Sequence, residues 1–411
     1  MKKHSVPFFA ALAAAALVFA CSPSPKMGDP VADAAENGEM GGAVDGEYVA
    51  GDPGSSDFEG GEGSGSGGNS QAGRVTAGEW NDLDNWDFWC GLMNGQEYAG
   101  NNAYWGFWTN NRVAVSVKNS AGAPLAGIKV VLKKGDDAVW TAVTDNLGKA
   151  ECWAGMFQLE EEVSGLRLLV SEQTADAKVT TWNSPNGVAV NEFVLDVASP
   201  VADKADIAFI VDATGSMGDE IQFLKDDLMD ILKKVGQMQS GVAFRTAALF
   251  YRDTGDEYLT RADNFSDNWE QTVNFISRQD ADGGDDWPEA VHTALEKGLQ
   301  DLSWNESAKT RIAFMLLDAP AHHQDDIIAS LQKSVKAYAA AGIKIIPISA
   351  SGIDKGTEFM LRYFALGTGG TYVFITNDSG IGGEHIEASV GEYQVEQLND
   401  LIVRLIKKYT D

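Results

Sequence analysis

The chain has 411 residues, of which 44% are hydrophobic, so it is long enough for two or three domains with sizeable cores. Its 60 acidic residues outnumber 31 basic ones, which gives a formal net charge of −29. This balance argues against binding nucleic acid or an anionic membrane surface through a basic patch, and it is compatible with a solvated envelope protein or a cation site.

The N-terminus has the pattern of a secretory signal over residues 1–20. The basic start MKKH precedes the apolar run FFAALAAAALVFA, which is too short for an ordinary membrane-spanning helix. The run ends in VFAC, which resembles a bacterial lipobox and implies that Cys21 becomes lipidated at the cell envelope. Ser22 after this cysteine favours the outer membrane. An ordinary signal peptide with a chance cysteine is the alternative.

The next two segments differ sharply in composition. Residues 21–74 are rich in Gly, Ser, Asp and Glu, so they cannot bury a core, and we expect a flexible linker between membrane and folded part. Residues 75–109 are dense in Trp, Phe and Tyr. For these we expect a packed lead-in segment that covers a neighbouring sheet, with a sugar- or peptide-binding face as the alternative.

Cys90 and Cys152 are the two cysteines that remain if Cys21 carries lipid. An even pair in an oxidising compartment predicts a disulfide, whereas two buried thiols are the other interpretation. The distance between the two sites decides between them, and the sequence does not give it.

Residues 110–199 predict a small all-β sandwich. In RVAVSVK, residues Val113, Val115 and Val117 alternate with polar residues, and IKVVLKK repeats this period of two. Turn signals such as NSAGAPLAG and TDNLG separate the short runs. The pattern GAPLAGIKVVL…AVTDNLGKAE resembles bacterial Ig-like and carboxypeptidase-regulatory-like domains, which implies a spacer or a binding module.

Residues 203–411 alternate strands with helices, which predicts an α/β fold with a doubly wound, mainly parallel sheet. The run ADIAFIVD is continuously apolar, as expected for a strand buried on both faces. Proline removes a ladder hydrogen bond, so we expect Pro347 near the end of the strand IKIIPIS. A helix follows the first strand, and its apolar side consists of Ile221, Leu224, Leu228, Ile231, Leu232 and Val235.

Acidic motifs are expected at the carboxyl ends of these strands, where ligands bind in open α/β sheets. Asp212 ends the first strand and begins DATGSM, Asp285 and Asp286 lie in GGDDWPEA, and Asp318 ends FMLLD. Carboxylates and hydroxyls are the hard ligands of Mg²⁺, and a divalent cation would remove the repulsion among the acids. No Cys or His group has zinc spacing. Helix capping by Asp212 and Asp318 is the structural alternative.

The motif DATGSM after a buried strand resembles the metal-ion-dependent adhesion site of von Willebrand factor A domains, whose first motif is Asp-x-Ser/Thr-x-Ser. The resemblance covers about residues 204–411. It implies that Asp212, Thr214 and Ser216 form the first ligand loop for Mg²⁺, or for Mn²⁺ or Ca²⁺, and that Asp318 matches the last ligand motif.

The middle ligand motif of that family contains a Thr in many members, whereas this sequence has Asp285 and Asp286. Spacing to Glu289 and Ala290 places Asp285 where the Thr would be. A related bacterial subset with Gly-Asp-x-Pro-Glu points to Asp286 instead. Both residues therefore stay candidates.

The resemblance implies a non-catalytic protein that binds a partner through a metal, with a glutamate or aspartate of the partner filling an open coordination position. A lipid anchor would present this adhesion or assembly module at the envelope and would be its only membrane contact. One competing hypothesis is a metal-dependent hydrolase using Asp318, His322 and His323, although no nucleophile motif or phosphate loop is evident. The other is a structural envelope scaffold with a vestigial metal site.

Overall fold

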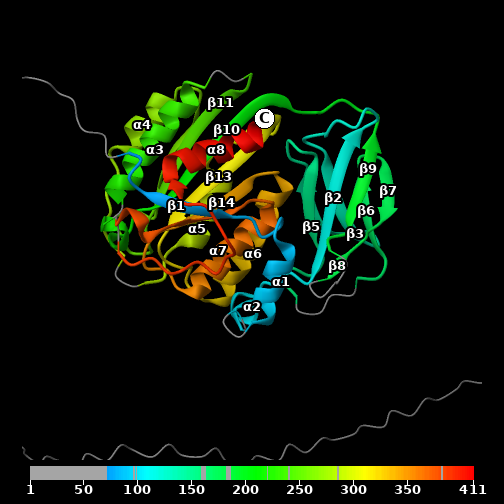
Figure 1. Ribbon diagram of the computed structural model, residues 1–411, viewed down its shortest axis with the longest axis horizontal. Helices are drawn as coiled ribbons and strands as arrows, with labels where there is room; N and C mark the ends of the chain where they lie inside the picture. Colours follow the sequence, from blue (N-terminus) through cyan, green and yellow to red (C-terminus); the bar gives the residue numbers. More distant parts are fainter. Residues whose placement is uncertain are drawn as a thin grey trace, which may run out of the picture. The chain divides into compact units, whose positions relative to one another are not determined.

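The computed structural model describes residues 72–95, 98, 100–158, 163–181, 187–219, 221–238, 241–284, 287–380 and 383–411. The predicted signal peptide, Cys21, most of the predicted linker, and Asp285 with Asp286 lie outside these residues. The described residues belong to one compact unit, Gly67–Asp411. It contains an α/β domain and an all-β region (Figure 1).

An eight-stranded sheet forms the centre of the α/β domain. Its strands are β1 (Thr76–Trp80), β10 (Ala202–Asp212), β11 (Ala243–Tyr251), β12 (Thr260–Ser266), β13 (Ala308–Leu317), β14 (Lys344–Ser349), β15 (Tyr372–Ile375) and β16 (Glu396–Gln397). Their order is β12-β11-β10-β13-β14-β15-β1-β16. The central pairs from β11 to β15 are parallel, whereas β12 and β1 join antiparallel. The predicted mainly parallel sheet is confirmed.

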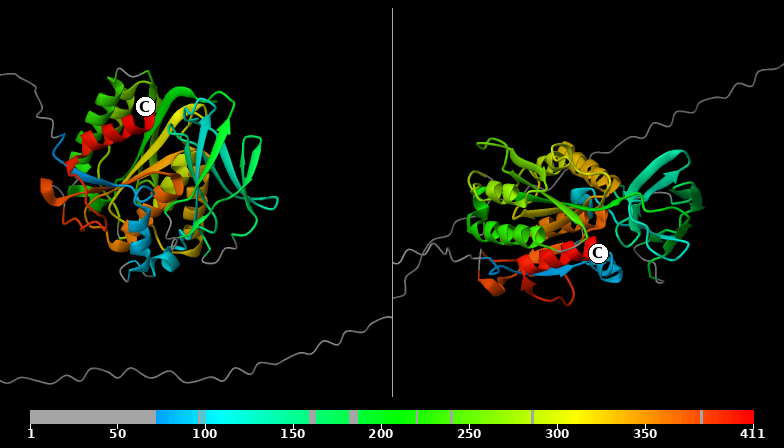
Figure 2. Two further views of the ribbon diagram at one scale, coloured as in Figure 1. Left: turned by 45° about the vertical axis from the view of Figure 1, so that its right-hand side comes forward. Right: turned by 90° about the horizontal axis from the view of Figure 1, so that it is seen from above.

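Helices cover both faces of this sheet (Figure 2). One core cluster contains residues of α3 (Ile221–Gly236), α4 (Trp269–Ile276) and α8 (Leu398–Thr410), and the other contains residues of α5 (Val291–Gln300), α6 (Asp325–Ala340) and α7 (Lys355–Thr368). Strand β10 contributes Phe209 to the first cluster and Ile210 to the second. The strand is therefore buried on both faces, which explains its continuous apolar run.

No helix among the described residues is both long and apolar enough to cross a membrane.

The aromatic lead-in segment belongs to the α/β domain. Strand β1 lies between β15 and β16, and helices α1 (Trp86–Asn94) and α2 (Asn101–Trp105) follow it. The Trp89 ring centroid lies 6.1 Å from that of Phe359 and 5.9 Å from that of Tyr363, both on α7. The all-β region is thus inserted in sequence between two strands of one sheet, and the α/β domain includes residues that precede 203.

A buried charge network fixes the lead-in to α7. The Arg362 side chain is fully buried and donates to both carboxylate oxygens of Asp82, at 2.9 and 2.5 Å. It also donates to Oε1 of Glu358 at 3.2 Å. Asp82 precedes α1, whereas Arg362 and Glu358 lie on α7. The network therefore joins parts of the chain that are far apart in sequence.

The all-β region contains two four-stranded sheets. One sheet consists of β2 (Asn111–Asn119), β5 (Lys149–Trp153), β8 (Thr180–Thr181) and β9 (Val190–Leu195), and the other of β3 (Lys129–Lys134), β4 (Asp137–Val143), β6 (Leu166–Val170) and β7 (Gln173–Asp176). Val113 and Val117 of β2 share a core cluster with Val130 and Leu132 of β3. The predicted alternation therefore places one face of each strand inward.

Cys90 and Cys152 are both free thiols, so the disulfide is not formed. Cys90 lies on α1 and is half-buried, whereas Cys152 lies on β5 and is fully buried. Burial raises the pKa of the Cys90 thiol to about 11 and also raises the pKa of Cys152. The two thiols are consequently structural rather than reactive.

Pro347 lies two residues before the carboxyl end of β14, near the strand end as expected, and it pairs with Met315 of β13. The ladder on the other side of β14 is short. Strand β15 pairs with β14 only at Ile348 and Ser349. Position 347 therefore has no partner residue on β15, and a missing N–H is tolerated there.

Asp227 of α3 makes the stability of the fold depend on pH. Its side chain is 1% exposed and accepts a hydrogen bond from the Gly73 N–H at 2.5 Å. Burial, together with the charges of Asp230 and Asp226, raises its pKa from the usual 3.8 to about 7. The folded state then binds a proton more tightly than the unfolded chain, so the free energy of unfolding falls as the pH rises between those two values.

We expect Asp227→Asn to raise the free energy of unfolding at pH 8 by about 2–4 kcal/mol, because the amide needs no proton to be neutral. At pH 4 the effect should be small. Urea unfolding at both pH values measures this, with Asp196→Asn, an exposed carboxylate of the all-β region, as the control. Equal stability of wild type and Asp227→Asn at pH 8 would contradict the prediction.

Candidate metal centre at the carboxyl ends of the strands

The turn that follows β10 brings three predicted ligands together. Oδ1 of Asp212 accepts hydrogen bonds from the Thr214 N–H at 2.9 Å and from Thr214 Oγ1 at 2.7 Å. Oγ1 of Thr214 lies 3.2 Å from Oγ of Ser216. Asp212 and Thr214 are buried, whereas Ser216 is exposed, so the loop leads from the sheet to the surface.

Two close backbone approaches shape this loop. The Gly215 N–H donates to the Gly283 carbonyl at 2.9 Å, and a Cβ on Gly215 would lie 2.7 Å from that oxygen. Gly284 has a φ of +71°, and its Cβ would lie 2.8 Å from Oε1 of Glu289 and 2.9 Å from Cβ of Thr214. Glycine at these positions therefore lets the loop before Asp285 pack against the Asp212 turn.

Gly284→Ala should lower the free energy of unfolding by at least about 1–2 kcal/mol, because it combines a left-handed backbone with two short contacts. Gly218→Ala is the matched control, since a Cβ there meets no atom within 4 Å. Urea denaturation of both variants measures the difference. A similar, small effect at the two positions would mean that the two loops are not packed as described.

Two further acids lie at the same edge of the sheet. Asp318 follows β13 and is 6% exposed, and Glu289 precedes α5 and is 2% exposed. The Glu289 N–H donates to the Pro320 carbonyl at 2.8 Å, which ties the loop before α5 to the loop after β13. In the sequence, Glu289 indicates only the spacing to the middle ligand motif, and it is not predicted as a site residue. Its position just before the helix that begins at Val291 is the sequence feature that places it at this edge.

Burial and neighbouring acids raise the pKa of two carboxyls at this edge. Burial raises the pKa of Asp212 to about 6, and the nearby charge of Asp253 adds to this, while the Thr214 hydrogen bonds oppose it. Burial raises the pKa of Glu289 to about 9, with further contributions from Asp212, Asp253 and Asp318. Such mutual repulsion is the condition that a divalent cation relieves.

The donor set of the Asp212 turn fits a hard cation. Oδ2 of Asp212 is buried and accepts no hydrogen bond from any described residue. Beside it are two hydroxyls, and oxygen donors of this kind suit Mg²⁺, Mn²⁺ or Ca²⁺. Within the described ranges, no group of three or more His, Cys, Asp and Glu side chains could hold a metal ion. The fit therefore rests on one carboxylate together with Thr214 and Ser216.

The two histidines after Asp318 have different partners. Nε2 of His322 lies 2.9 Å from Oδ1 of Asp253. The His323 ring stacks on Tyr104 of α2 with a centroid distance of 3.6 Å, and its Nε2 lies 2.6 Å from the Tyr104 carbonyl. His322 thus faces the acidic edge, whereas His323 contacts the lead-in segment. The two rings therefore have separate partners, one in the loop after β11 and one on α2.

Residues 206–346 match the von Willebrand factor A domain family. Over 121 residues the chain is 32% identical to an ariadne-like RING finger protein of Acanthamoeba polyphaga mimivirus. The aligned segment covers 29% of this chain and 12% of that protein. It is 30% identical over 119 residues to the alpha-protein kinase vwkA of Dictyostelium discoideum, an alignment that covers 28% of this chain and 19% of the kinase. It is 26% identical over 186 residues to the collagen alpha-6(VI) chain of Homo sapiens, an alignment that covers 43% of this chain and 8% of the collagen chain.

The chain therefore spans less than a fifth of the length of these curated relatives. Among solved structures, an aerotolerance-related membrane protein from Bacteroides fragilis NCTC 9343 is similar, with 11% sequence identity and a TM-score of 0.33. That similarity covers 50% of this chain and 98% of the other.

Proposed function

We propose, from the premise that this chain carries a von Willebrand factor A domain, that it is a protein-binding module whose partner presents a carboxylate to a divalent cation. The observation that carries this proposal is the convergence of Asp212, Thr214 and Ser216 in one turn at the carboxyl end of β10. A buried carboxylate oxygen without a hydrogen bond from the described residues is available there.

The chain's own residues define how such a site would work. Asp212, Thr214 and Ser216 would hold the ion, and Asp318 with either Asp285 or Asp286 would complete the set. When bound, Mg²⁺ supplies a positive, open coordination position for a glutamate or aspartate of the partner. Ser216 is exposed, so the outer end of the loop is reachable from solvent.

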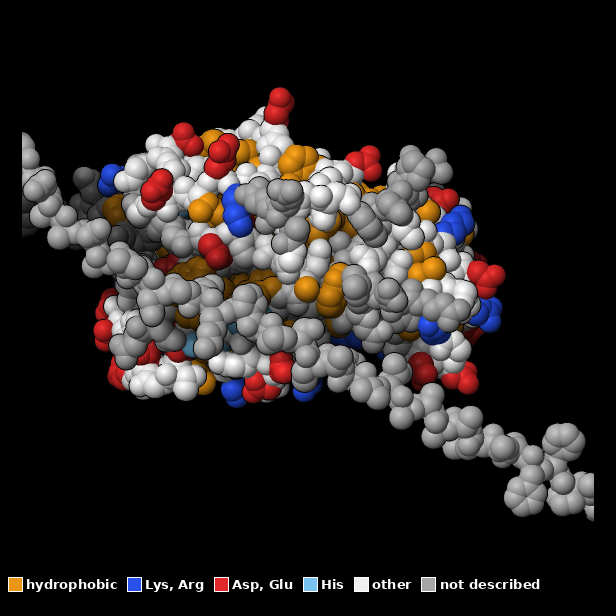
Figure 3. Space-filling model, turned by 90° about the horizontal axis from the view of Figure 1, so that it is seen from below, with side chains coloured by type: hydrophobic (Ala, Val, Ile, Leu, Met, Phe, Trp, Pro, Cys, Tyr) orange, Lys and Arg blue, Asp and Glu red, His pale blue; other side chains and the backbone are white. Residues whose placement is uncertain are grey.

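The negative charge of the molecule makes the binding of a partner carboxylate depend strongly on a cation. Acidic side chains are spread over the face that Figure 3 shows, and the whole chain has a net charge of −29. Repulsion would hold a bare partner carboxylate away from this surface. A partner that binds through a carboxylate therefore needs the cation.

The proposed function is binding rather than catalysis. The proteins that match part of this chain are named as a RING finger protein, an alpha-protein kinase and a collagen chain, and the matching parts are 8% to 19% of their length. A segment found within such different proteins supports a binding module. The separate partners of His322 and His323 give the hydrolase alternative no support.

Isothermal titration calorimetry of the purified chain with Mg²⁺ and with Mn²⁺ tests the metal-dependent proposal. We expect saturable binding of at least one ion at a single site. Absence of binding for both ions would overturn the metal site and leave a cation-independent binding module.

We also propose that Cys21 carries a lipid that tethers the module to a bacterial cell envelope, at the outer membrane. The support is the sequence VFAC after a short apolar run. Metabolic labelling with an alkyne fatty acid should label the wild type and not Cys21→Ala, and this variant should move to the soluble fraction. Cys90→Ala is the control that should keep the label. Equal labelling of Cys21→Ala would exclude lipidation at this residue.

A further inference from the structure

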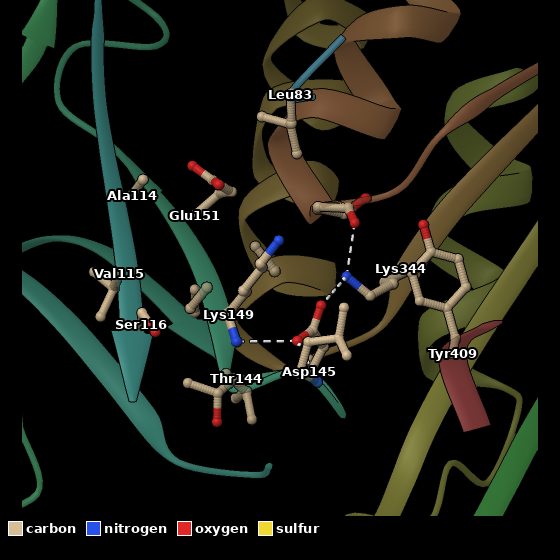
Figure 4. A pocket seen from close by; sticks show the side chains of 18 of the residues that line it. Leu83, Ala114, Val115, Ser116, Thr144, Asp145, Lys149, Glu151, Lys344 and Tyr409 are labelled. Atoms are coloured by element: carbon tan, nitrogen blue, oxygen red, sulfur yellow. Dashed lines mark hydrogen bonds and ion pairs between the residues drawn. The ribbon is translucent and has the colours of Figure 1, made fainter. Parts of the chain in front are cut away.

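A cavity of about 410 Å³ lies between the all-β region and the α/β domain (Figure 4). Its walls come from β2, β4 and β5 on one side, and from the amino ends of β13 and β14 and the carboxyl ends of α6, α7 and α8 on the other. Because Asp212 lies at the carboxyl end of β10, the cavity and the candidate metal centre are at opposite ends of the parallel strands.

The lining of this cavity reverses the charge balance of the chain. Acidic residues outnumber basic ones 60 to 31 over the whole sequence. The cavity instead has the acids Asp84, Asp145, Glu151 and Glu192 against a larger set of cations. These cations are Arg112, Lys149, Lys309, Arg311, Lys344 and Lys408.

Protein carboxylates neutralise some of these cations. Arg112 pairs with Glu151 at 2.8 Å, and both side chains are largely buried. Lys344 lies 3.1 Å from Asp145 and donates to the Gly369 carbonyl at 2.6 Å. These pairs form part of the wall and leave little charge to attract a ligand.

Arg311 is the buried cation of the wall that forms no ion pair with a described residue. It is 6% exposed, and its Nη1 donates to the carbonyls of Asn305, Glu306 and Ala308 at 2.8 to 3.0 Å. Its Nε is buried and has no hydrogen-bond partner within the described part of the chain. Backbone carbonyls satisfy donors but carry no net charge, so the positive charge of Arg311 stays uncompensated by them.

The nearest acid on the sheet is already occupied. Asp206 of β10 is the register partner of Arg311 on β13, but its carboxylate accepts from Arg245 at 2.9 and 2.6 Å. A Cβ placed on Gly342 would lie 2.8 Å from Nη2 of Arg311 and 2.8 Å from Cβ of Val143. Gly342 and Val143 both line the cavity, so Nη2 of Arg311 lies at its wall. The guanidinium therefore reaches the boundary between the two parts of the molecule.

The opposite wall has apolar side chains between its charged ones. Ala114 and Ser116 of β2 lie across the cavity from Lys344 and Tyr409 in Figure 4. Small apolar side chains such as Ala142, Val143 and Val188 add to the lining. A cavity of this volume, at the boundary between two parts of a protein and lined by both apolar and charged side chains, has the size and the place of a small-molecule site.

We propose that this cavity binds a small amphipathic carboxylate, with the anionic group paired to Arg311 and the apolar body against β2. The buried guanidinium would gain a directly paired carboxylate, which none of the described residues supplies, and the apolar side chains of the opposite wall would exclude water from the remainder of the ligand. The site is independent of the proposed cation-dependent function, since it lies at the other end of the sheet.

Calorimetric titration of the full chain with octanoate tests this proposal. Octanamide has the same apolar body without the charge, and acetate has the charge without the body. We expect octanoate to bind at least tenfold more tightly than either control. No detectable octanoate binding, or equal affinity for octanamide or acetate, would overturn the proposal.

Variants locate the site. Arg311→Gln should bind octanoate no better than octanamide, but it also loses hydrogen bonds to three carbonyls, so a second variant tests the site without that loss. Ser116→Trp places a large ring in the cavity from a half-buried strand position, and it should abolish octanoate binding with the fold retained by circular dichroism. Asp212→Asn should bind octanoate like the wild type. Unchanged binding by a folded Ser116→Trp, or loss of binding in Asp212→Asn, would place the ligand elsewhere.

Discussion

Asp212→Asn should reduce the affinity for Mg²⁺ by about 100-fold or more, because the change removes the one carboxylate of the Asp212 turn and keeps its size. The amide oxygen can still accept from Thr214, so the turn itself should persist. Calorimetric titration with Mg²⁺ and Mn²⁺ measures the effect on the ion. Binding of the same ions at wild-type affinity would show that the metal does not depend on this loop.

Asp203→Asn provides the matched control for this variant. Asp203 belongs to the same strand, β10, but its side chain is 73% exposed and lies near the strand's amino end. It should bind Mg²⁺ like the wild type. An equal loss of affinity in both variants would point to the overall negative charge of the chain, rather than the Asp212 turn, as the source of cation binding.

Much of the α/β fold could be predicted because its signals are local. The run ADIAFIVD required burial on both faces, and the structure places Phe209 and Ile210 in different core clusters. The apolar side of α3 is buried as its spacing predicted. Strand β1 gave no such signal, since TAGEW is short and pairs with β15, almost 300 positions later. Pairing over that distance depends on tertiary packing that no local pattern contains.

The candidate site also contains residues whose proximity is local and residues that only the fold brings together. Asp212, Thr214 and Ser216 are two residues apart in one turn, so their proximity follows from local geometry. Glu289 and His322 come from separate loops, and only the register between neighbouring elements brings them to the acidic edge. The pairing of Arg311 with backbone carbonyls likewise depends on tertiary structure. Nothing in the run RIAFMLLD indicates that its arginine lacks a carboxylate partner among the described residues.

Arg362 shows how strongly such tertiary charges can hold the fold together. It lies on α7 with no exposed side-chain surface, and its two carboxylate partners are Asp82 and Glu358. The Trp80 indole also donates to Asp82 at 3.0 Å. Coulombic attraction to Asp82 and its hydrogen bonds raise the pKa of Arg362 against the effect of burial, so the guanidinium stays charged. The lead-in segment thus provides one of the two carboxylates that pair with this guanidinium.

Asp82→Ala should therefore lower the free energy of unfolding by about 3–5 kcal/mol, because it leaves a buried guanidinium with one carboxylate for its five donors. Asp82→Asn keeps the shape and part of the hydrogen bonding, so its loss should be smaller. Asp84→Ala, two residues away and exposed, should change stability by less than about 0.5 kcal/mol. Urea unfolding monitored by tryptophan fluorescence measures all three. Equal losses for Asp82→Ala and Asp84→Ala would show that the ion pair does not fix the lead-in to α7, and that the aromatic contacts of Trp89 are sufficient to hold it there.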